Sequence, residues 1–195
     1  AQNPDAILLV APADHVITDI PAFHAAIAQG LTAIEKTDQL ITFGITPTHA
    51  ETGYGYLELP TAPDGPDAVA LNRFVEKPDA ATAEDMVKSG RYLWNAGLFL
   101  FRARTLLDAY AAHAPALIGP VSQAVEHATS DLGFLRLAPE PWAQADNISI
   151  DYAVMEKADN ISVVPLSGGW SDLGSWEAVR RISPADGDGV VLHGP

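Results

Sequence analysis

The opening of the chain alternates between apolar runs and a helical pattern, and this alternation constrains the fold more than any other sequence feature. Residues 7–10 (ILLV) predict a short buried strand. Apolar residues follow at helical spacing over residues 21–36, and residues 39–45 (QLITFGI) predict a second strand. Strand, helix and strand joined by short connections are typical of an α/β sheet with parallel strands.

The rest of the chain continues this alternation. A strand over residues 92–103 is expected to be buried on both faces, because apolar residues fill it without alternation. Further extended segments are predicted over residues 52–59, 68–78 and 161–166, and helices over residues 79–90, 103–130, 148–158 and 174–182. The helix predicted over residues 103–130 is expected to break at Pro115, with Pro120 as a second candidate. Without repeats or linkers, residues 1–195 are interpreted as one α/β unit.

The charge balance limits the classes of ligand. The chain carries 25 acidic residues and 11 Lys or Arg, a formal charge of −14, which argues against nucleic-acid binding. A small phosphorylated substrate stays compatible if a divalent cation, backbone amides or a few placed cations hold it. No apolar run approaches the ~18 residues of a membrane span, and there is no cysteine for a disulfide or thiolate site. We therefore expect a soluble, cytoplasmic protein that binds no membrane.

Polar side chains follow several predicted strands. In open α/β sheets, ligands bind beyond the carboxyl ends of the strands. The candidates are Asp14 and His15 after the first strand, Glu76 and Lys77 before Pro78, Asn95 and Gly97 in the long strand, and Asp172 in GGWSDLGSW. Each has a purely structural alternative: a helix cap for PADH, a surface turn for EKP, and satisfaction of a backbone group for Asn95. Gly55, between Tyr54 and Tyr56, indicates a close backbone approach.

Taken together, these residues favour a transfer site. Asp14 and Asp172 would suit Mg²⁺, which commonly takes one or two carboxylates. Lys77 could offset charge on a phosphate, while Glu76 and Asn95 suit sugar hydroxyls. Such a set predicts phosphoryl or nucleotidyl transfer, in which positioning and electrostatics carry the catalysis.

Six stretches carry a resemblance to a known family. They are LLVAPADHVI, TGYGYLEL, FVEKP, LWNAGLFLF, ISIDYAVMEK and GGWSDLGSW. In this order, from about Ile7 to Ile182, the chain resembles mannose-1-phosphate guanylyltransferase (GDP-mannose pyrophosphorylase), the bacterial type often fused to mannose-6-phosphate isomerase. The resemblance implies a Rossmann-like nucleotide-diphospho-sugar transferase fold, an α/β fold with a mixed, mainly parallel sheet flanked by helices.

The resemblance also implies an activity and roles. The family makes GDP-mannose and pyrophosphate from GTP and mannose 1-phosphate with Mg²⁺. Asp14 and Asp172 would bind the metal and, with Lys77, form the catalytic set. Lys77 would also hold the sugar phosphate. The other substrate-binding residues would be Tyr54, Gly55, Glu76, Asn95 and Gly97.

One part of the family pattern has no counterpart here. The glycine-rich, arginine-containing nucleotide loop and the lysine that follows it match nothing in residues 1–195. We therefore expect these residues to be the C-terminal portion of a single nucleotidyltransferase domain, truncated at both ends. Base specificity cannot be read from them, and assembly as a homo-oligomer stays open.

Three alternatives keep part of this interpretation. A glycosyltransferase would release a nucleoside diphosphate in place of pyrophosphate. Another sugar-1-phosphate nucleotidyltransferase would act on a sugar such as glucose 1-phosphate. A non-catalytic remnant would bind sugar phosphate without transfer, although retention of Asp14, Lys77 and Asp172 argues against it.

Overall fold

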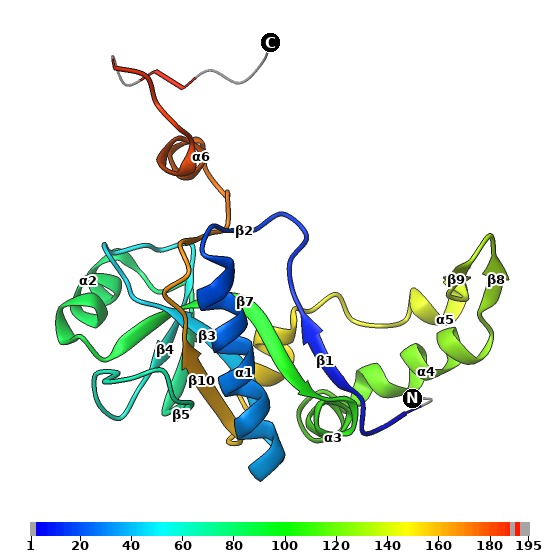
Figure 1. Ribbon diagram of the computed structural model, residues 1–195. Coiled ribbons are helices and arrows are strands. Elements are labelled where there is room, and N and C mark those ends of the chain that lie inside the picture. The colour runs from blue at the N-terminus through cyan, green and yellow to red at the C-terminus, as the bar shows by residue number, and fades with distance from the viewer. Residues whose placement is uncertain (1–2, 188–189, 192–195) are drawn as a thin grey trace.

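A seven-stranded mixed sheet forms the centre of the computed structural model, which describes residues 3–187 and 190–191 (Figure 1). Along the sheet, the order of six strands is β5-β10-β3-β7-β4-β6, and β1 also pairs with β7. Their bounds are β1 Ile7–Val10, β3 Leu40–Ile45, β4 Gly55–Glu58, β5 Val69–Ala70, β6 Arg73–Glu76, β7 Tyr92–Arg102 and β10 Ile161–Pro165. The predicted class, a mixed sheet with flanking helices, is confirmed.

The direction of pairing differs from the prediction of a mainly parallel sheet. Within the described residues, β3 and β10 form the parallel pair, and the other ladders of this sheet are antiparallel. Strands β1 and β3 do run in the same direction, as the opening pattern predicts, but β7 lies between them and runs the opposite way. Sequence periodicity could not reveal this insertion, because β7 lies about fifty residues further along the chain.

Strand β7 supports the whole sheet. Strand β3 pairs with one edge, while β1 and β4 pair with the two ends of the other edge. Alternate side chains of β7 enter two different cores, with Leu93, Phe99 and Phe101 in one and Ala96, Leu98 and Leu100 in the other. The prediction that this strand is buried on both faces is therefore confirmed.

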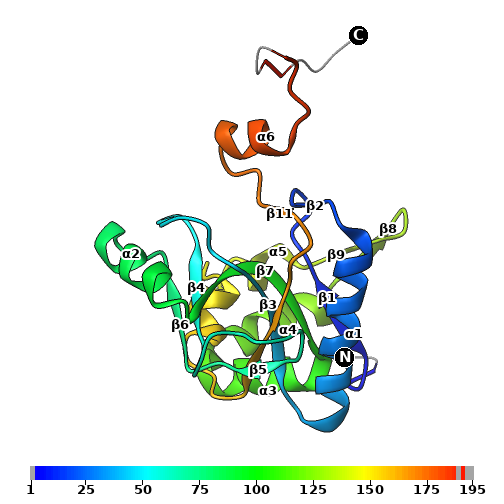
Figure 2. The ribbon, with the colours of Figure 1, turned by 60° about the vertical axis from the view of Figure 1, so that its left-hand side comes forward.

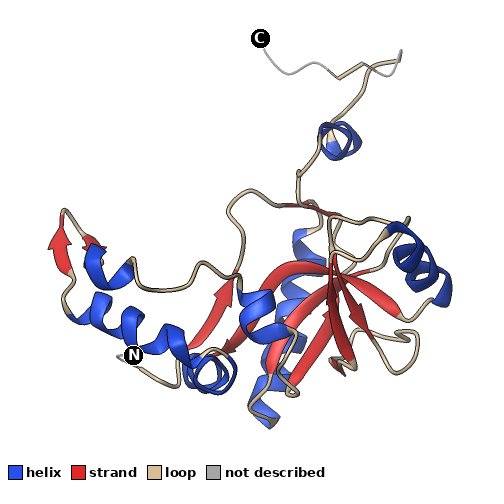
Figure 3. Ribbon diagram, turned by 180° about the vertical axis from the view of Figure 1, so that it is seen from behind, coloured by secondary structure: helices blue, strands red, loops and turns tan. Residues whose placement is uncertain are grey.

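Helices cover both faces of the sheet. Helix α1 (Ile20–Lys36) packs on one face through residues such as Ala26 and Ile34 (Figure 1). On the other face lie α3 (Ala103–His113) and η2, a π-helical turn over Asp151–Met155 (Figure 3). Helix α2 (Ala80–Ser89) packs beside β7 and Tyr56.

Capping residues explain where three helices begin or end. The side chains of Asp19, Asp79 and Ser175 accept backbone hydrogen bonds at the starts of α1, α2 and α6 (Trp176–Ile182). Gly90 closes α2 with a φ of 68°, a left-handed conformation suited to glycine. The predicted helix starting at Ser175 and the predicted stop at Gly90 are confirmed.

An appendage extends to one side of the sheet (Figure 1). It contains η1 (Pro115–Leu117), α4 (Ile118–Glu126), the hairpin of β8 (Thr129–Asp131) and β9 (Phe134–Arg136), and α5 (Pro139–Trp142). The predicted break at Pro115 is confirmed, whereas Pro120 lies in the first turn of α4, where proline is tolerated. The helical prediction is wrong at residues 129–130, which belong to the hairpin. No helix in the described ranges is both long and apolar enough to cross a membrane.

Strand β1 is not buried, contrary to the prediction. Its four residues are between 38% and 44% exposed. Within the described part of the chain, β1 has a strand neighbour along one edge only, which is β7. Apolar content alone therefore predicted the strand correctly but not its surroundings.

Candidate functional site

The predicted residues gather at one end of the central sheet. Strands β3, β6 and β10 end there, and their carboxyl ends lead into the segments 46–54, 77–79 and 166–175. A second, two-stranded sheet pairs β2 (Val16–Ile17) with β11 (Trp170–Ser171) above this end (Figure 2). This pairing joins the segment after β1 to the segment after β10, so residues about 155 positions apart meet at the site.

Asp172 is held by a close set of contacts. Its Oδ1 accepts hydrogen bonds from the Tyr54 hydroxyl at 2.9 Å and from the Gly174 backbone N–H at 3.1 Å. A Cβ on Gly174 would lie 2.7 Å from Oδ2, so glycine keeps this oxygen uncovered. Leu173 adopts a φ of 54° between them, a conformation that side chains disfavour. The carboxylate is thus fixed through one oxygen and presents the other.

Two tryptophan rings pack against the ring of Tyr54. The Tyr54 ring meets Trp94 and Trp170 edge to face, at centroid distances of 5.2 and 5.4 Å. Burial raises the pKa of Tyr54 above its usual range, and the hydrogen bond to Asp172 raises it further. Tyr54 therefore stays a protonated donor at neutral pH. Trp170 in turn donates from Nε1 to His15 Nδ1 at 3.2 Å, so neutral His15 carries its proton on Nε2.

Asp14 lies on the neighbouring segment. The register pairs Ser171 with Val16, so Asp14 and Asp172 stand on adjoining chain segments, and Asp14 is exposed. Groups of three or more metal-binding side chains are absent from the described residues.

Glu76 and Lys77 form an ion pair at the end of β6. Lys77 Nζ lies 3.2 Å from Glu76 Oε1, with the Lys77 side chain 58% exposed and that of Glu76 10% exposed. Burial raises the pKa of Glu76, although the hydrogen bond from Lys77 opposes this shift. Lys77 has a φ of 48°, and its backbone N–H donates to the Tyr54 carbonyl at 3.2 Å. This bond ties the lysine to the segment that carries Tyr54.

Gly55 provides the close approach that its sequence context predicts. It lies opposite Glu76 in the β4–β6 ladder. A Cβ at this position would lie 2.6 Å from Glu76 Oε2 and 3.0 Å from Phe74 Cζ. Gly55 therefore leaves space for the Glu76 carboxylate. This role is structural, because it positions a side chain that is predicted to bind the sugar.

Asn95 and Gly97 lie at a bulge in β7. The ladder with β3 shifts register between Thr42 and Gly44, and Gly97 has a φ of 67° there. Asn95 Oδ1 accepts from Thr42 Oγ1 at 2.9 Å and from Gly97 N at 3.2 Å. Asn95 Nδ2 donates to Asp151 at 3.1 Å. The structural alternative for Asn95, satisfaction of a backbone group, is therefore part of its role.

Asp151 is the site residue that sequence reasoning missed. It lies at the start of η2 and accepts from Asn95. Burial raises its pKa, and its charge in turn raises the pKa of Glu76. Its motif was noted, but its partner lies 56 residues away, so spacing gave no signal of the contact. Hydrogen bonds, an ion pair and charge interactions thus connect all the predicted residues except Asp14, which the β2–β11 pairing brings alongside.

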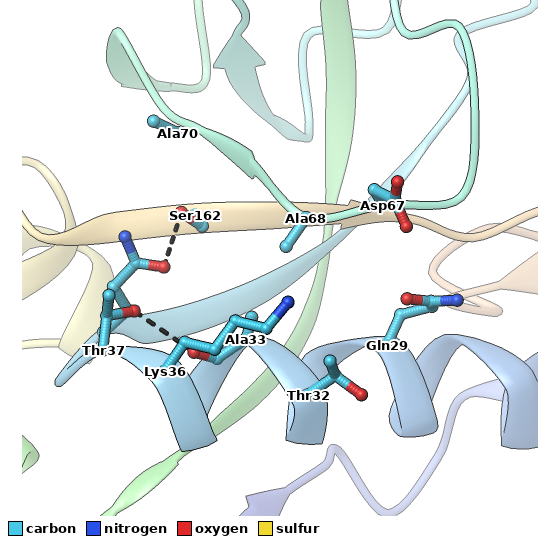
Figure 4. Close-up of a pocket in the computed structure, with 10 residues that line it drawn as sticks. Gln29, Thr32, Ala33, Lys36, Thr37, Asp67, Ala68, Ala70 and Ser162 are labelled. Carbon is cyan, nitrogen blue, oxygen red and sulfur yellow. Dashed lines mark hydrogen bonds between the residues drawn. The ribbon is translucent and has the colours of Figure 1, made fainter.

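A hollow between α1 and the β5–β10 edge has a different set of residues around it (Figure 4). It has a volume of about 390 Å³. Its lining includes Lys36, Asp67 and Ser162, and none of the predicted site residues.

Comparison with known proteins identifies the family to which this fold belongs. The profile of the family described as "Nucleotidyl transferase" matches residues 1–189. The xanthan biosynthesis protein XanB of Xanthomonas campestris pv. campestris (strain B100) is 47% identical over 190 residues, which are 97% of this chain and 40% of that protein. The mannose-1-phosphate guanylyltransferase RfbM of Salmonella typhimurium is 46% identical over 194 residues, covering 100% of this chain and 40% of that protein.

A solved structure gives the same result for the fold. The crystal structure described as mannose-6-phosphate isomerase from Helicobacter pylori is 31% identical, with a TM-score of 0.79, and covers 87% of this chain and 66% of that chain. The chain spans about 40% of the length of the curated relatives named above. The predicted Rossmann-like nucleotidyltransferase fold is confirmed. Because the family profile extends over almost the whole chain, the protein belongs to the nucleotidyl transferase family.

Proposed function

We propose that this chain is the sugar-phosphate-binding part of a mannose-1-phosphate guanylyltransferase. The observation that carries the proposal is the arrangement of Asp172, whose carboxylate presents Oδ2 at the same sheet end as Lys77 and Asn95. The name of RfbM, which is similar over the full chain, supports mannose 1-phosphate and GTP as the substrates. Metal, sugar and phosphate groups would then meet at this end of the sheet.

In the proposed reaction, a phosphate oxygen of mannose 1-phosphate attacks the α-phosphorus of GTP. A new P–O bond forms, the bond from the α-phosphorus to the bridging oxygen breaks, and pyrophosphate leaves with the electron pair. The attacking phosphate is already ionised at neutral pH, so the residues need only hold the two substrates in line. Lys77 would turn from Glu76 to the sugar phosphate and offset its charge.

Mg²⁺ is the cofactor that we propose for this site. Asp14 and Asp172 would hold it, and it would supply neutralisation of phosphate charge. Tyr54 and the Gly174 N–H would keep Asp172 in one orientation while Oδ2 stays open. Tyr54, Gly55, Glu76, Asn95 and Gly97 would form or shape the sugar pocket.

Three further statements stay predictions. The chain would be the C-terminal portion of a larger catalytic domain, which the exposure of β1 supports. It would act in the cytoplasm. It could also form a homo-oligomer.

The test is a pyrophosphate-release assay on the full-length chain. GTP with mannose 1-phosphate should release pyrophosphate faster than ATP or UTP, and faster than GTP with glucose 1-phosphate. Release with glucose 1-phosphate alone would support the other sugar-1-phosphate nucleotidyltransferase. Binding of mannose 1-phosphate without release would support the non-catalytic remnant. Conversion of mannose 6-phosphate to fructose 6-phosphate should be measured in parallel, since the similar Helicobacter pylori structure is described as an isomerase.

A further inference from the structure

The Asn95 amide is fixed in one orientation by two donors. Thr42 Oγ1 lies 2.9 Å from Asn95 Oδ1 and 3.3 Å from the Leu98 carbonyl oxygen, so its single proton has the shorter bond at Asn95. The Gly97 backbone N–H donates to Asn95 Oδ1 at 3.2 Å. Thr42 is almost fully buried, with 1% exposed. A flipped amide would point its NH₂ group at the Gly97 N–H, which cannot turn to become an acceptor. The bulge backbone therefore excludes the flipped orientation.

Asp151 reinforces this orientation from the other side. Its Oδ1 accepts from Asn95 Nδ2 at 3.1 Å. A flipped amide would place its carbonyl oxygen against this carboxylate, which is unfavourable whenever Asp151 is charged. Asp151 itself is half-buried and lies at the start of η2, whose last three residues, Ala153, Val154 and Met155, pack in the core. Asn95 is thus held between a rigid strand bulge and a packed helical turn.

This fixed orientation determines which hydrogen-bonding groups of the Asn95 amide remain for a ligand. Asn95 Nδ2 carries two hydrogens, and within the described residues Asp151 accepts one of them. Because Asn95 is only partly buried, we infer that the second N–H is open to a ligand. The carbonyl oxygen already receives two donors, which fill its two lone pairs. The amide can therefore offer a ligand a hydrogen-bond donor but no free acceptor.

We propose that Thr42, Gly97 and Asp151 position Asn95 as a donor-only group, so that the sugar is read through an acceptor oxygen at this point. The inference rests on the proposed function, because it needs a hexose 1-phosphate at this sheet end. Asp151 is then a positioning residue that acts through Asn95. Its role differs from that of Glu76, whose carboxylate can only accept from a sugar hydroxyl when ionised.

A charge-swapped variant separates this polarity from a structural role. In the double variant Asn95→Asp/Asp151→Asn, the bond between the two residues is kept with its direction reversed, and the net charge is unchanged. Thr42 and the Gly97 N–H can still donate to position 95. The accessible oxygen at that position can then only accept. The single variant Asp151→Asn keeps an acceptor for Nδ2 and serves as the matched control.

The measurement is the affinity of the full-length chain for mannose 1-phosphate by calorimetry, with thermal unfolding of each variant. We expect the double variant to unfold near the wild-type temperature but to bind at least about ten-fold more weakly. The single variant Asp151→Asn should lose less affinity than the double variant. Wild-type affinity in the double variant would overturn the inference and leave the proposed function standing. No binding by the wild-type chain would overturn both.

A second measurement changes the ligand and does not require the double variant. The 2-, 3-, 4- and 6-deoxy analogues of mannose 1-phosphate are compared on the wild type and on Asn95→Ala. One analogue should bind both proteins equally, because it lacks the oxygen that Asn95 contacts. If every analogue still binds the wild type more tightly than Asn95→Ala, Asn95 donates to none of these four hydroxyl oxygens, and the inference that it reads a sugar hydroxyl is wrong.

Discussion

At the scale of single residues, the site is built from polar groups that have few alternatives for hydrogen bonding. One carboxylate oxygen of Asp172 accepts hydrogen bonds from Tyr54 and Gly174. The side-chain carbonyl of Asn95 accepts hydrogen bonds from Thr42 and Gly97. We propose that the remaining hydrogen-bonding capacity of each group serves the substrate or the metal. Preorganised groups of this kind lose little conformational entropy when a ligand binds, because their orientation is set when the protein folds.

The first prediction concerns Asp172→Asn. The amide oxygen can still accept from Tyr54 and from the Gly174 N–H, so the fold should keep its melting temperature within a few degrees. A neutral amide is a poor ligand for Mg²⁺, and we expect kcat/KM for pyrophosphate release to fall by about 100-fold or more. Asp64→Asn, in an exposed turn, is the matched control and should change neither quantity. Equal losses of activity and stability would contradict the metal role.

The second prediction concerns the pH dependence of stability. Burial raises the pKa of Asp151, so the folded state binds its proton more tightly than the unfolded state does. The free energy of unfolding should therefore fall as pH rises from about 4, the usual carboxyl value, to the raised pKa of the folded state. Asp151→Asn should remove this part of the slope in urea unfolding between pH 4 and 7. Asp64→Asn removes the same charge at the surface, and an equal flattening there would assign the slope to net charge instead.

The residues that sequence reasoning found are those with chemistry next to a strand end. Asp172 and Lys77 could be proposed because ligands bind where strands end, and Asn95 could be proposed as a polar amide inside an otherwise apolar strand. Asp151 could not, since its importance comes from a contact with Asn95 that only the packing of η2 on the sheet creates. The aromatic surroundings of Tyr54 were missed for the same reason, because Trp94 and Trp170 come from different strands.

At the scale of elements, the bulge in β7 is the feature that shapes the site. Gly97 adopts a φ of 67°, and a Cβ there would lie 3.5 Å from Pro12, an ordinary contact. The cost of a side chain at this position is therefore conformational and not steric. We predict that Gly97→Ala lowers the free energy of unfolding by about 1 to 2 kcal/mol.

Gly65→Ala provides the control for this third prediction. Gly65 lies in a surface turn where a Cβ would meet nothing within 4 Å. Its free energy of unfolding should stay within about 0.5 kcal/mol of the wild type in urea titrations. If both alanine variants lose the same stability, the bulge has no special conformational demand.

Elements with local signals were predicted well. Helices α2 and α6 have caps that the sequence displays, and β7 has an uninterrupted apolar run. Predictions failed where a neighbour decides the outcome. The surroundings of β1, the direction of most ladders and the β8–β9 hairpin all depend on segments distant in sequence or on turn geometry at Leu132 and Gly133, both of which have positive φ.

At the scale of the whole molecule, an acidic surface coexists with an exposed apolar strand. The formal charge of −14 disfavours close approach of two copies, whereas β1 offers apolar side chains and a strand edge. We predict that residues 1–195 alone self-associate, more strongly at high salt, where charge repulsion is screened. Light scattering over a range of salt concentrations would measure this.

The fourth prediction has two matched variants. Leu9→Lys places a charge on β1 and should lower the apparent mass at high salt, because lysine at an edge opposes strand pairing. Leu132→Lys removes an apolar side chain that is 94% exposed at the hairpin tip, and should have a smaller effect. A larger effect of Leu132→Lys would assign the association to the hairpin.

The shared use of β7 limits how chains of this fold can vary in length. Strands β3 and β4 take their register from its first half, and β1 and β3 from its second half, with the bulge between them. A one-residue deletion within residues 92–102 would turn every later side chain to the opposite face. Insertions and deletions among relatives should therefore avoid this stretch and collect in surface turns such as residues 60–67, where length can change without disturbing Asn95.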